Sequence, residues 1–328
     1  RAIHLNRQNI GRSRSRRRHR HNERRRRERV SSARVNIFGM TEEKIIETYC
    51  LSSNAILELL EELRADLEPV TRRSHAISCM AKLLSTLHFL AFGSFQRTGA
   101  ISAGISQSNF SGVLSHLLNA MSRRMGRYIK FPRTPDTLDA TKRGFCAVAG
   151  FPKIIGAIDC THVEHIYRNR IHNVVAQYPG SVHDSFILRN SVLFQKRRDG
   201  EYGDGWLLGD SAYPLHPFLM TPVLNPTTPG EHRYNVAHIQ TRNIVERTFG
   251  MLKSRSRCLD RTGGALLYRP EKVAQITVVC CILHNIAKCH GLEHDALDVE
   301  ENPHRPHVGQ LNAAGLQTGA NLIQSHFS

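Results

Sequence analysis

Three acidic residues of the chain stand where a carboxylate could do chemistry. Asp159 ends the apolar run IIGAID, and Asp210 ends the apolar run WLLGD in the same way. Glu246 lies in the segment RNIVERTFG, next to Val245 and three residues before Phe249, so its helix face is expected to turn towards a sheet. Carboxylate oxygens are the ligands that hard cations such as Mg²⁺ prefer. Two such ions can activate a water or a 3′-hydroxyl and stabilise the leaving oxygen in phosphodiester cleavage.

Each of these acids also has an ordinary structural explanation. A strand-end Asp such as Asp159 or Asp210 usually caps a turn or a following helix. Glu246 could pair with Arg242, four residues earlier, or with the adjacent Arg247. Together the three acids are more specific, because clustered carboxylates repel each other unless a cation lies between them. We therefore expect them to gather around a divalent metal.

The elements that must position these acids are short strands and one long helix. Apolar runs predict strands over residues 153–162, 173–180 and within 205–214. Helical spacing predicts helices over 183–197, 237–259 and 270–291, with Pro270 at the start of the last one and Gly291 at its end. This mixture of strands and helices indicates an α/β domain over residues 138–294.

The residues before this domain show helical periodicity only. Residues 36–130 are expected to form an all-α region, and 97–121 read as a helix-turn-helix with its turn at Gly104. The front of its second helix would present Gln107, Ser108 and Asn109, which can reach base edges or phosphates. Two packed helices with a capped N-terminus are the alternative. Two prolines make residues 131–137 a predicted linker.

The two ends of the chain have compositions that cannot form a core. Residues 1–35 are an arm with thirteen Arg against two Glu before Val30, and this arm holds most of the net charge of +17. Such an arm is expected to be disordered and to serve as a nuclear localisation signal or a nucleic-acid-binding tail, or else as a plain solvated run. Residues 295–328 lack periodicity and are also predicted to be disordered.

Several function classes are excluded by what the sequence lacks. No apolar run reaches the roughly 18–20 residues that span a bilayer, so no membrane association is expected. The chain has no GxxxxGK[ST] and no GxGxxG between a strand and a helix, which argues against nucleotide binding. A GxSxG nucleophile motif is also missing.

Five motifs of the chain resemble, in order, those of Harbinger-type (PIF/Harbinger) transposases: GAIDCTH, YPGSVHDS, LLGDSAYPL, TRNIVERTFGMLKSR and ILHNIA. The resemblance runs from about Ile77 to about Lys288, and LLSTLHFLAFGSFQ with GISQSNFSGVL is similar to that family's N-terminal helix-turn-helix region. It implies an RNase H-like mixed sheet flanked by helices, preceded by the helix-turn-helix region. It also implies a nuclease acting at terminal inverted repeats of DNA in the nucleus, with a separate Myb-like partner protein. Carried onto this sequence, the family's Asp-Asp-Glu triad, which binds two Mg²⁺ or Mn²⁺, is Asp159, Asp210 and Glu246, with 35 residues between the last two.

Other residues are secondary site candidates. Asp184 is the rival for the second metal acid, but it opens a predicted helix, where an N-cap role accounts for it. His162 and His183 could support the metal ligands or contact phosphate. Arg242 and Lys253 lie on about the same helix face as the third acid and could meet DNA phosphates, with solvated basic positions as the alternative.

The chain also departs from the family pattern. Cys160 stands where relatives usually have Gly, and the segment HVEHIYRNRIHNVVAQYPG is short. Family members have an additional strand and turn there, and its loss would leave backbone groups of the sheet unpaired. Two functions therefore stay open. One is an active metal-dependent DNA nuclease or transposase, and the other is an inactive relative that binds DNA without cutting it.

Overall fold

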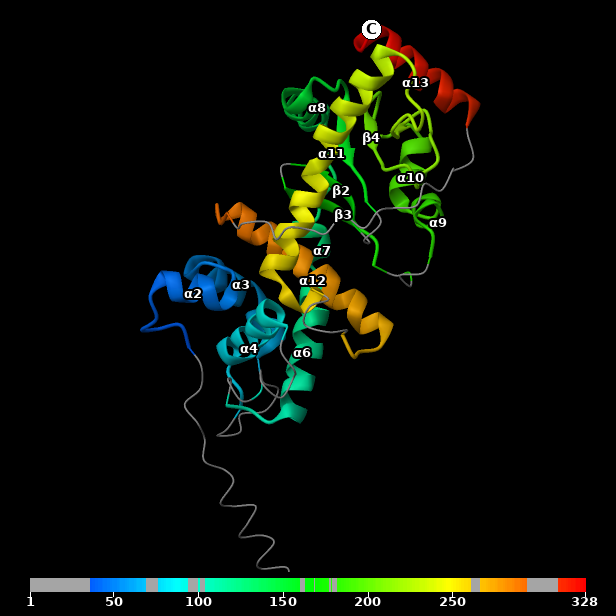
Figure 1. Ribbon diagram of the computed structural model, residues 1–328. Coiled ribbons are helices and arrows are strands. Elements are labelled where there is room, and N and C mark those ends of the chain that lie inside the picture. The colour runs from blue at the N-terminus through cyan, green and yellow to red at the C-terminus, as the bar shows by residue number, and fades with distance from the viewer. Residues whose placement is uncertain are drawn as a thin grey trace, which may run out of the picture.

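The computed structural model describes residues 36–68, 76–93, 100, 104–159, 163–167, 169–176, 178, 182–260, 266–293 and 312–328, and of 163–167 and Asp184 it describes the backbone only. The Arg-rich arm and Cys160 lie outside these residues. A helical region, a mixed sheet and the helices around it follow one another along the chain (Figure 1).

The part of the chain before the sheet contains helices, most of them started by a side-chain cap. These helices are α2 (Glu42–Tyr49), α3 (Ser53–Leu67), α4 (Cys79–Phe92), α6 (Gln107–Ser122) and the single turn α7 (Met125–Tyr128). Four of them begin after a Ser or Thr whose hydroxyl accepts from a backbone N–H three residues on: Thr41, Ser52, Ser78 and Ser106. Local sequence therefore fixes where these helices start.

The sheet has five strands in the order β3-β2-β1-β4-β5. Its strands are β1 (Ile154–Ala157), β2 (Val163–Tyr167), β3 (Arg170–Val174), β4 (Trp206–Leu208) and β5 (Leu219–Met220). The strands β1, β2 and β3 pair antiparallel, whereas β4 runs parallel to β1 and β5 runs parallel to β4. The strand expected over 173–180 is thus β3, which lies earlier in the chain.

β1 has an antiparallel neighbour, β2, which in turn pairs with β3, so the expected loss of a strand after β1 is corrected. The chain turns between β2 and β3 at Asn169, which has φ 55°, a left-handed conformation that Asn tolerates. The β2–β3 register shifts on either side of His165. The sequence predicts that a strand after β1 is absent. The structure instead has a short hairpin there, formed by β2 and β3 with an irregular register.

The exposed edge of β3 is closed by the motif ILHNIA. Asn285, on α12 (Pro270–Cys289), accepts from the Ile171 backbone N–H at 2.9 Å and donates to the Ile171 carbonyl at 2.6 Å. The same amide donates to the Tyr128 carbonyl at 3.0 Å. Neighbouring His284 contacts the Asn169 carbonyl with Nε2 at 2.8 Å. Side chains of α12 thus satisfy backbone groups that an edge strand would leave unpaired.

Helices cover both faces of the sheet (Figure 1). Side chains alternate along a strand, so Ile154 and Ile155 of β1 face opposite sides of the sheet. Ile154 packs in the core that includes α11 (Pro229–Arg255) and α12. Ile155 packs in the core that includes α9 (Asp184–Arg189) and α10 (Val192–Arg198). The first of these cores also contains buried residues of α2, α3, α4 and α6. One continuous core therefore joins segments that the sequence assigns to separate regions.

Local capping sets three helix boundaries that the sequence does not predict. Helix α8 (Pro135–Ala149) begins inside the predicted linker, where Thr134 and Thr137 form a capping box. The helix predicted over 183–197 is two helices, because Ser191 caps α10 anew. Helix α11 begins at Pro229, where Thr228 and Glu231 form a second capping box, and not at residue 237.

The expectation of a disordered tail over 295–328 is wrong for its last part. Asn312 caps the helix α13 (Ala313–His326), whose chain end packs Phe327 against Phe151 and Tyr234. Gly315 lets this helix approach closely, since a Cβ there would lie 2.9 Å from the Leu215 carbonyl oxygen. Polar caps and small residues make this helix inconspicuous in the sequence.

Among the described helices, α12 is the one that is long and apolar enough, by length and composition, to cross a membrane. Its 20 residues reach the length that no apolar run of the sequence was expected to reach. Slightly more than half of its most apolar window is buried inside the protein. It contacts α6, α7, α11 and β3, which is the arrangement of a core helix.

Candidate active site

Asp159 and Asp210 follow neighbouring parallel strands at matched positions. Ala157 on β1 pairs with Leu208 on β4, and the Ile158 backbone N–H donates to the Leu208 carbonyl at 2.8 Å. Each acid lies two residues beyond its member of that pair, so the register brings both acids to the same edge of the sheet. Their side chains are mostly buried, with 16% and 10% of the side-chain surface exposed.

The backbone around Asp210 fixes one of its two carboxylate oxygens. The Ala212 backbone N–H donates to Asp210 Oδ1 at 2.9 Å, a local turn that Asp favours. The other oxygen, Oδ2, lies 3.6 Å from Arg242 Nη2 on α11. Gly209 makes room for this turn, because a Cβ there would lie 3.0 Å from the Tyr213 ring.

Arg242 contacts all three acids that the sequence singles out. Its Nη2 lies 3.1 Å from Asp159 Oδ1, and its Nη1 lies 3.1 Å from Glu246 Oε1, one turn later on α11. With the contact to Asp210, one guanidinium pairs with carboxylates from two strand ends and a helix. We call Asp159, Asp210 and Glu246 the acidic triad. Three formal negative charges around one positive charge leave this site with an unbalanced negative charge.

The donor set of the acidic triad fits a hard divalent cation, although the guanidinium stands where such an ion would bind. Mg²⁺ binds oxygens at about 2.0–2.1 Å, much closer than the 3.1–3.6 Å between the triad oxygens and the Arg242 nitrogens. Accordingly, no three His, Cys, Asp or Glu side chains of the described residues already lie close enough to hold a metal. Within the same residues Arg242 Nε is buried without a hydrogen-bond partner, so the guanidinium is not fully satisfied where it lies.

His238 lies one turn before Arg242 and was not among the residues expected from the sequence. Its buried Nε2 lies 3.2 Å from the Met220 carbonyl, which ties α11 to β5. Burial above all, with a smaller contribution from the charge of Arg242, lowers the pKa of His238 to about 4. The ring is therefore neutral at pH 7 and adds no charge beside the guanidinium. Its i−4 spacing from Arg242 is the one sequence signal that could have found it.

The secondary candidates lie on other elements or farther along α11. His183 is exposed and occupies the N-cap of α9, and Asp184 is the first residue of that helix, so Asp184 is not itself the cap. The Asp184 side chain and all of His162 lie outside the described residues. Lys253 is half-buried on α11, two turns beyond Glu246.

The front of α6 is exposed, as expected for the second helix of a helix-turn-helix. Gln107, Ser108 and Asn109 are all exposed, and the Ser106 hydroxyl accepts from the Asn109 backbone N–H at 3.3 Å. Gly104 makes the preceding turn with φ 64°. Most of the residues expected to form the first helix lie outside the described part of the chain.

The basic segment after α6 is held by acids of α3. Arg124 lies 3.2 Å from Glu62 and 2.5 Å from Asp66, and Arg123 lies 2.5 Å from Asp66. Arg127 lies 3.2 Å from Glu62. The three arginines of this segment therefore tie α6 and α7 to α3.

Comparison with known proteins gives the family. The family model described as "DDE superfamily endonuclease" matches residues 160–285, which include Asp210 and Glu246 and begin one residue after Asp159. "Putative nuclease HARBI1" of Homo sapiens is 34% identical over 90% of this chain and 93% of its own length, and the Xenopus laevis protein of that name is 33% identical over the same shares. "Protein ALP1-like" of Arabidopsis thaliana is 25% identical over 56% of this chain and 54% of its own length.

No solved structure matches the chain significantly. The identity to the vertebrate nucleases extends over nearly the whole chain, well beyond the five motifs. The chain therefore belongs to the Harbinger transposase-derived nucleases of the DDE endonuclease superfamily.

Proposed function

We propose that this protein is a metal-dependent DNA endonuclease of the transposase type, with the acidic triad as its metal-binding and catalytic residues. The observation that carries the proposal is that three carboxylates, two just beyond the ends of β1 and β4 and one on α11, contact one guanidinium. Three carboxylates with only one guanidinium between them keep a net negative charge. Such a cluster is expensive without a further cation and is typical of a site built to bind a metal ion. Membership of the DDE endonuclease superfamily, whose nucleases generally use divalent metals, supports the same conclusion.

The metal would be Mg²⁺ or Mn²⁺, held by oxygens of the acidic triad. Two such ions supply an activated water or 3′-hydroxyl and stabilise the leaving oxygen in phosphodiester cleavage. The chain's own contribution is positional. The parallel β1–β4 register sets the two Asp side by side, and the Ala212 N–H orients Asp210. Packing of α11 on the sheet brings Glu246 to them.

Arg242 has a role of its own in this proposal, as the resident cation of the metal-free protein. Its guanidinium balances part of the triad's charge and would have to leave the centre of the site for a metal to be held there. The side chain is 14% exposed, and its partner Glu246 is 40% exposed, so one side of the contact is open to solvent. Once displaced, a guanidinium at this place is suited to pair with a DNA phosphate.

The fold and cellular setting complete the proposal. An antiparallel β1–β3 meander, followed by parallel β4 and β5 and with acids after β1 and β4, supports an RNase H-like assignment. The exposed front of α6 and Lys253 would contact DNA, and His162, His183 and Asp184 would support the site. The arm of residues 1–35 would direct the protein to the nucleus, where a Myb-like partner would supply DNA specificity. Residues 131–134, before α8, would connect the two functional regions.

A second candidate function is DNA binding without cleavage. The guanidinium in the centre of the triad and the irregular β2–β3 register favour it, because both would suit a site that no longer loads metal.

Nicking of a supercoiled plasmid that carries candidate terminal repeats separates the two functions. We expect the full chain to nick it with Mg²⁺ or Mn²⁺ and not with EDTA, and Asp210→Asn to abolish the activity. Asp199→Asn, at an exposed position after α10, is the matched control and should be unaffected. Equal cleavage by wild type and Asp210→Asn would refute the triad, and DNA binding without any cleavage would favour the second candidate.

A further inference from the structure

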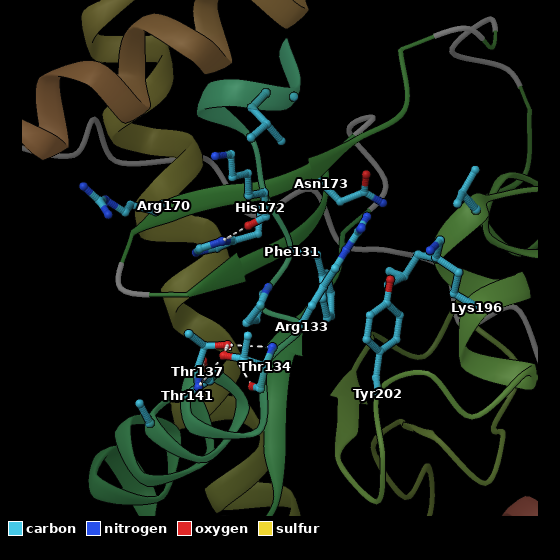
Figure 2. A pocket seen from close by; sticks show the side chains of 17 residues that line it. Phe131, Arg133, Thr134, Thr137, Thr141, Arg170, His172, Asn173, Lys196 and Tyr202 are labelled. Carbon is cyan, nitrogen blue, oxygen red and sulfur yellow. Dashed lines mark hydrogen bonds between the residues drawn. The ribbon is translucent and has the colours of Figure 1, made fainter. Parts of the chain in front are cut away.

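A second site lies on another part of the sheet and shares no residue with the acidic triad. It is a pocket of about 810 Å³ between β3, α10, the start of α8 and residues 129–134 (Figure 2). Of the 17 residues that line it, four are Lys or Arg and none is Asp or Glu: the cations are Lys130, Arg133, Arg170 and Lys196. We call this site the basic pocket.

Two of these cations are available to a ligand. Lys130 and Arg133 are exposed, and within the described residues neither forms an ion pair. Figure 2 shows Arg133 extending through the middle of the pocket, with Lys196 on the facing wall. Lys196 is partly neutralised by Glu201 at 2.7 Å, and Glu201 does not line the pocket. The pocket therefore carries a net positive charge that other side chains do not balance.

Several cations elsewhere on the described part of the chain are neutralised by nearby acids. Asp204 lies 2.6 Å from Lys142 and 3.1 Å from Lys153, and these pairs hold the pKa of Asp204 at about 2. The arginines after α6 are paired with acids of α3, as described above. In the basic pocket, by contrast, cations gather in one concave site whose lining contains no acid, and this indicates an anionic ligand.

The shape and the other walls narrow the class of ligand. The volume is that of pockets that hold one small molecule or a few linked units, and a DNA duplex is too wide to enter it. Apolar side chains line part of it, among them Phe131, which packs on buried Tyr202 with 4.3 Å between ring centroids. Cations beside an aromatic wall are the usual surface for a single nucleic-acid strand, whose phosphates meet the cations and whose bases meet the ring.

We propose that the basic pocket binds a single DNA strand by its phosphate backbone, outside the site of cleavage. This inference rests on the proposed nuclease function, because it assigns a place to part of that enzyme's substrate. Lys130 and Arg133 contact consecutive phosphates, and the Phe131 wall contacts sugar or base. A strand held here anchors the substrate while the acidic triad acts on another segment.

Lysine footprinting on the full chain tests the proposal directly. The Arg-rich arm contains no Lys, so lysine acylation reports only on the residues that follow it. The probe is an oligothymidylate of about 12 nucleotides, within the site sizes of roughly 4–16 nucleotides that such grooves cover. We expect it to protect Lys130 several-fold and to leave Lys153, which is paired with Asp204, unchanged.

Binding measurements give the second readout. The double variant Lys130→Gln/Arg133→Gln should bind the oligothymidylate about tenfold more weakly and lower the slope of log affinity against log salt by about 1.4, since each phosphate contact contributes about 0.7. Arg143→Gln, on the exposed side of α8, removes one charge outside the pocket and should change neither.

Unprotected Lys130 together with an unchanged salt slope would overturn the proposal, as would protection by duplex DNA but not by the oligothymidylate. Both readouts are made in EDTA, so they do not depend on cleavage. Failure of the nuclease assignment shows instead as the absence of metal-dependent plasmid nicking that requires Asp210.

Discussion

Replacing Arg242 by Gln tests whether this side chain is the resident cation of the acidic triad. The change keeps a polar but shorter side chain and removes the charge that pairs with all three carboxylates. Removing one partner of a buried ion pair costs about 3–5 kcal/mol. Because Glu246 is 40% exposed and solvent screens its share, we expect the metal-free variant to lose about 2–3 kcal/mol of unfolding free energy.

Metal should narrow the difference in unfolding free energy between Arg242→Gln and wild type. A divalent ion no longer has to displace a guanidinium in Arg242→Gln, so Mn²⁺ should bind the variant at least about tenfold more tightly, and each tenfold corresponds to about 1.4 kcal/mol. The assays are urea unfolding in EDTA and in Mn²⁺, and Mn²⁺ binding followed by electron paramagnetic resonance. Arg247→Gln, at the exposed neighbouring position Arg247, is the matched control and should behave like wild type. A metal-free variant as stable as wild type, or one with weaker Mn²⁺ affinity, would refute the reasoning.

Three other predictions concern the scaffold. Asn285→Ala removes the amide that closes the edge of β3 and should cost about 2–4 kcal/mol in urea unfolding, and a loss below about 1 kcal/mol would contradict that role. Burial lowers the pKa of both His238 and His284 to about 4 from the ordinary 6.5, so the unfolded chain takes up protons first as the pH falls. Unfolding free energy should therefore fall between about pH 6.5 and 4, by about 1 kcal/mol for each histidine at pH 5.5, and a flat profile would exclude buried neutral rings. Gly315→Ala should displace α13 and expose it to limited proteolysis, whereas Gly319→Ala, whose Cβ would meet nothing closer than 4.0 Å, should not; equal proteolysis of the two variants would count against the close contact.

Local sequence signals were strong enough to predict several elements. Apolar runs located β1 and β4, because a buried strand needs continuous apolar residues. Pro270 and the periodicity after it located α12. The helix starts that the sequence predicts wrongly lie at caps made of ordinary polar residues, such as Thr228 with Glu231 before α11. The spacing of apolar residues does not reveal such caps.

The hairpin β2–β3 shows why the sequence did not predict how the sheet is completed. A comparison of motif lengths predicts a missing strand, but the chain closes the sheet with a tight turn at Asn169 and an amide from α12. Both devices depend on residues that are far apart in sequence, since Ile171 and Asn285 are brought together only by packing of α12 on β3. No local pattern carries that information.

The sequence by itself determined the three acids, their strand-end and helical settings and the family motifs. It also offered Arg242 as a partner of Glu246, since i,i+4 spacing is a property of one helix. Only the tertiary structure decided that the same guanidinium reaches Asp159 and Asp210, because that requires the β1–β4 register and the packing of α11 across the sheet. The basic pocket likewise exists only in the fold, which sets Lys130, Arg170 and Lys196 around one cavity although they come from three separate segments.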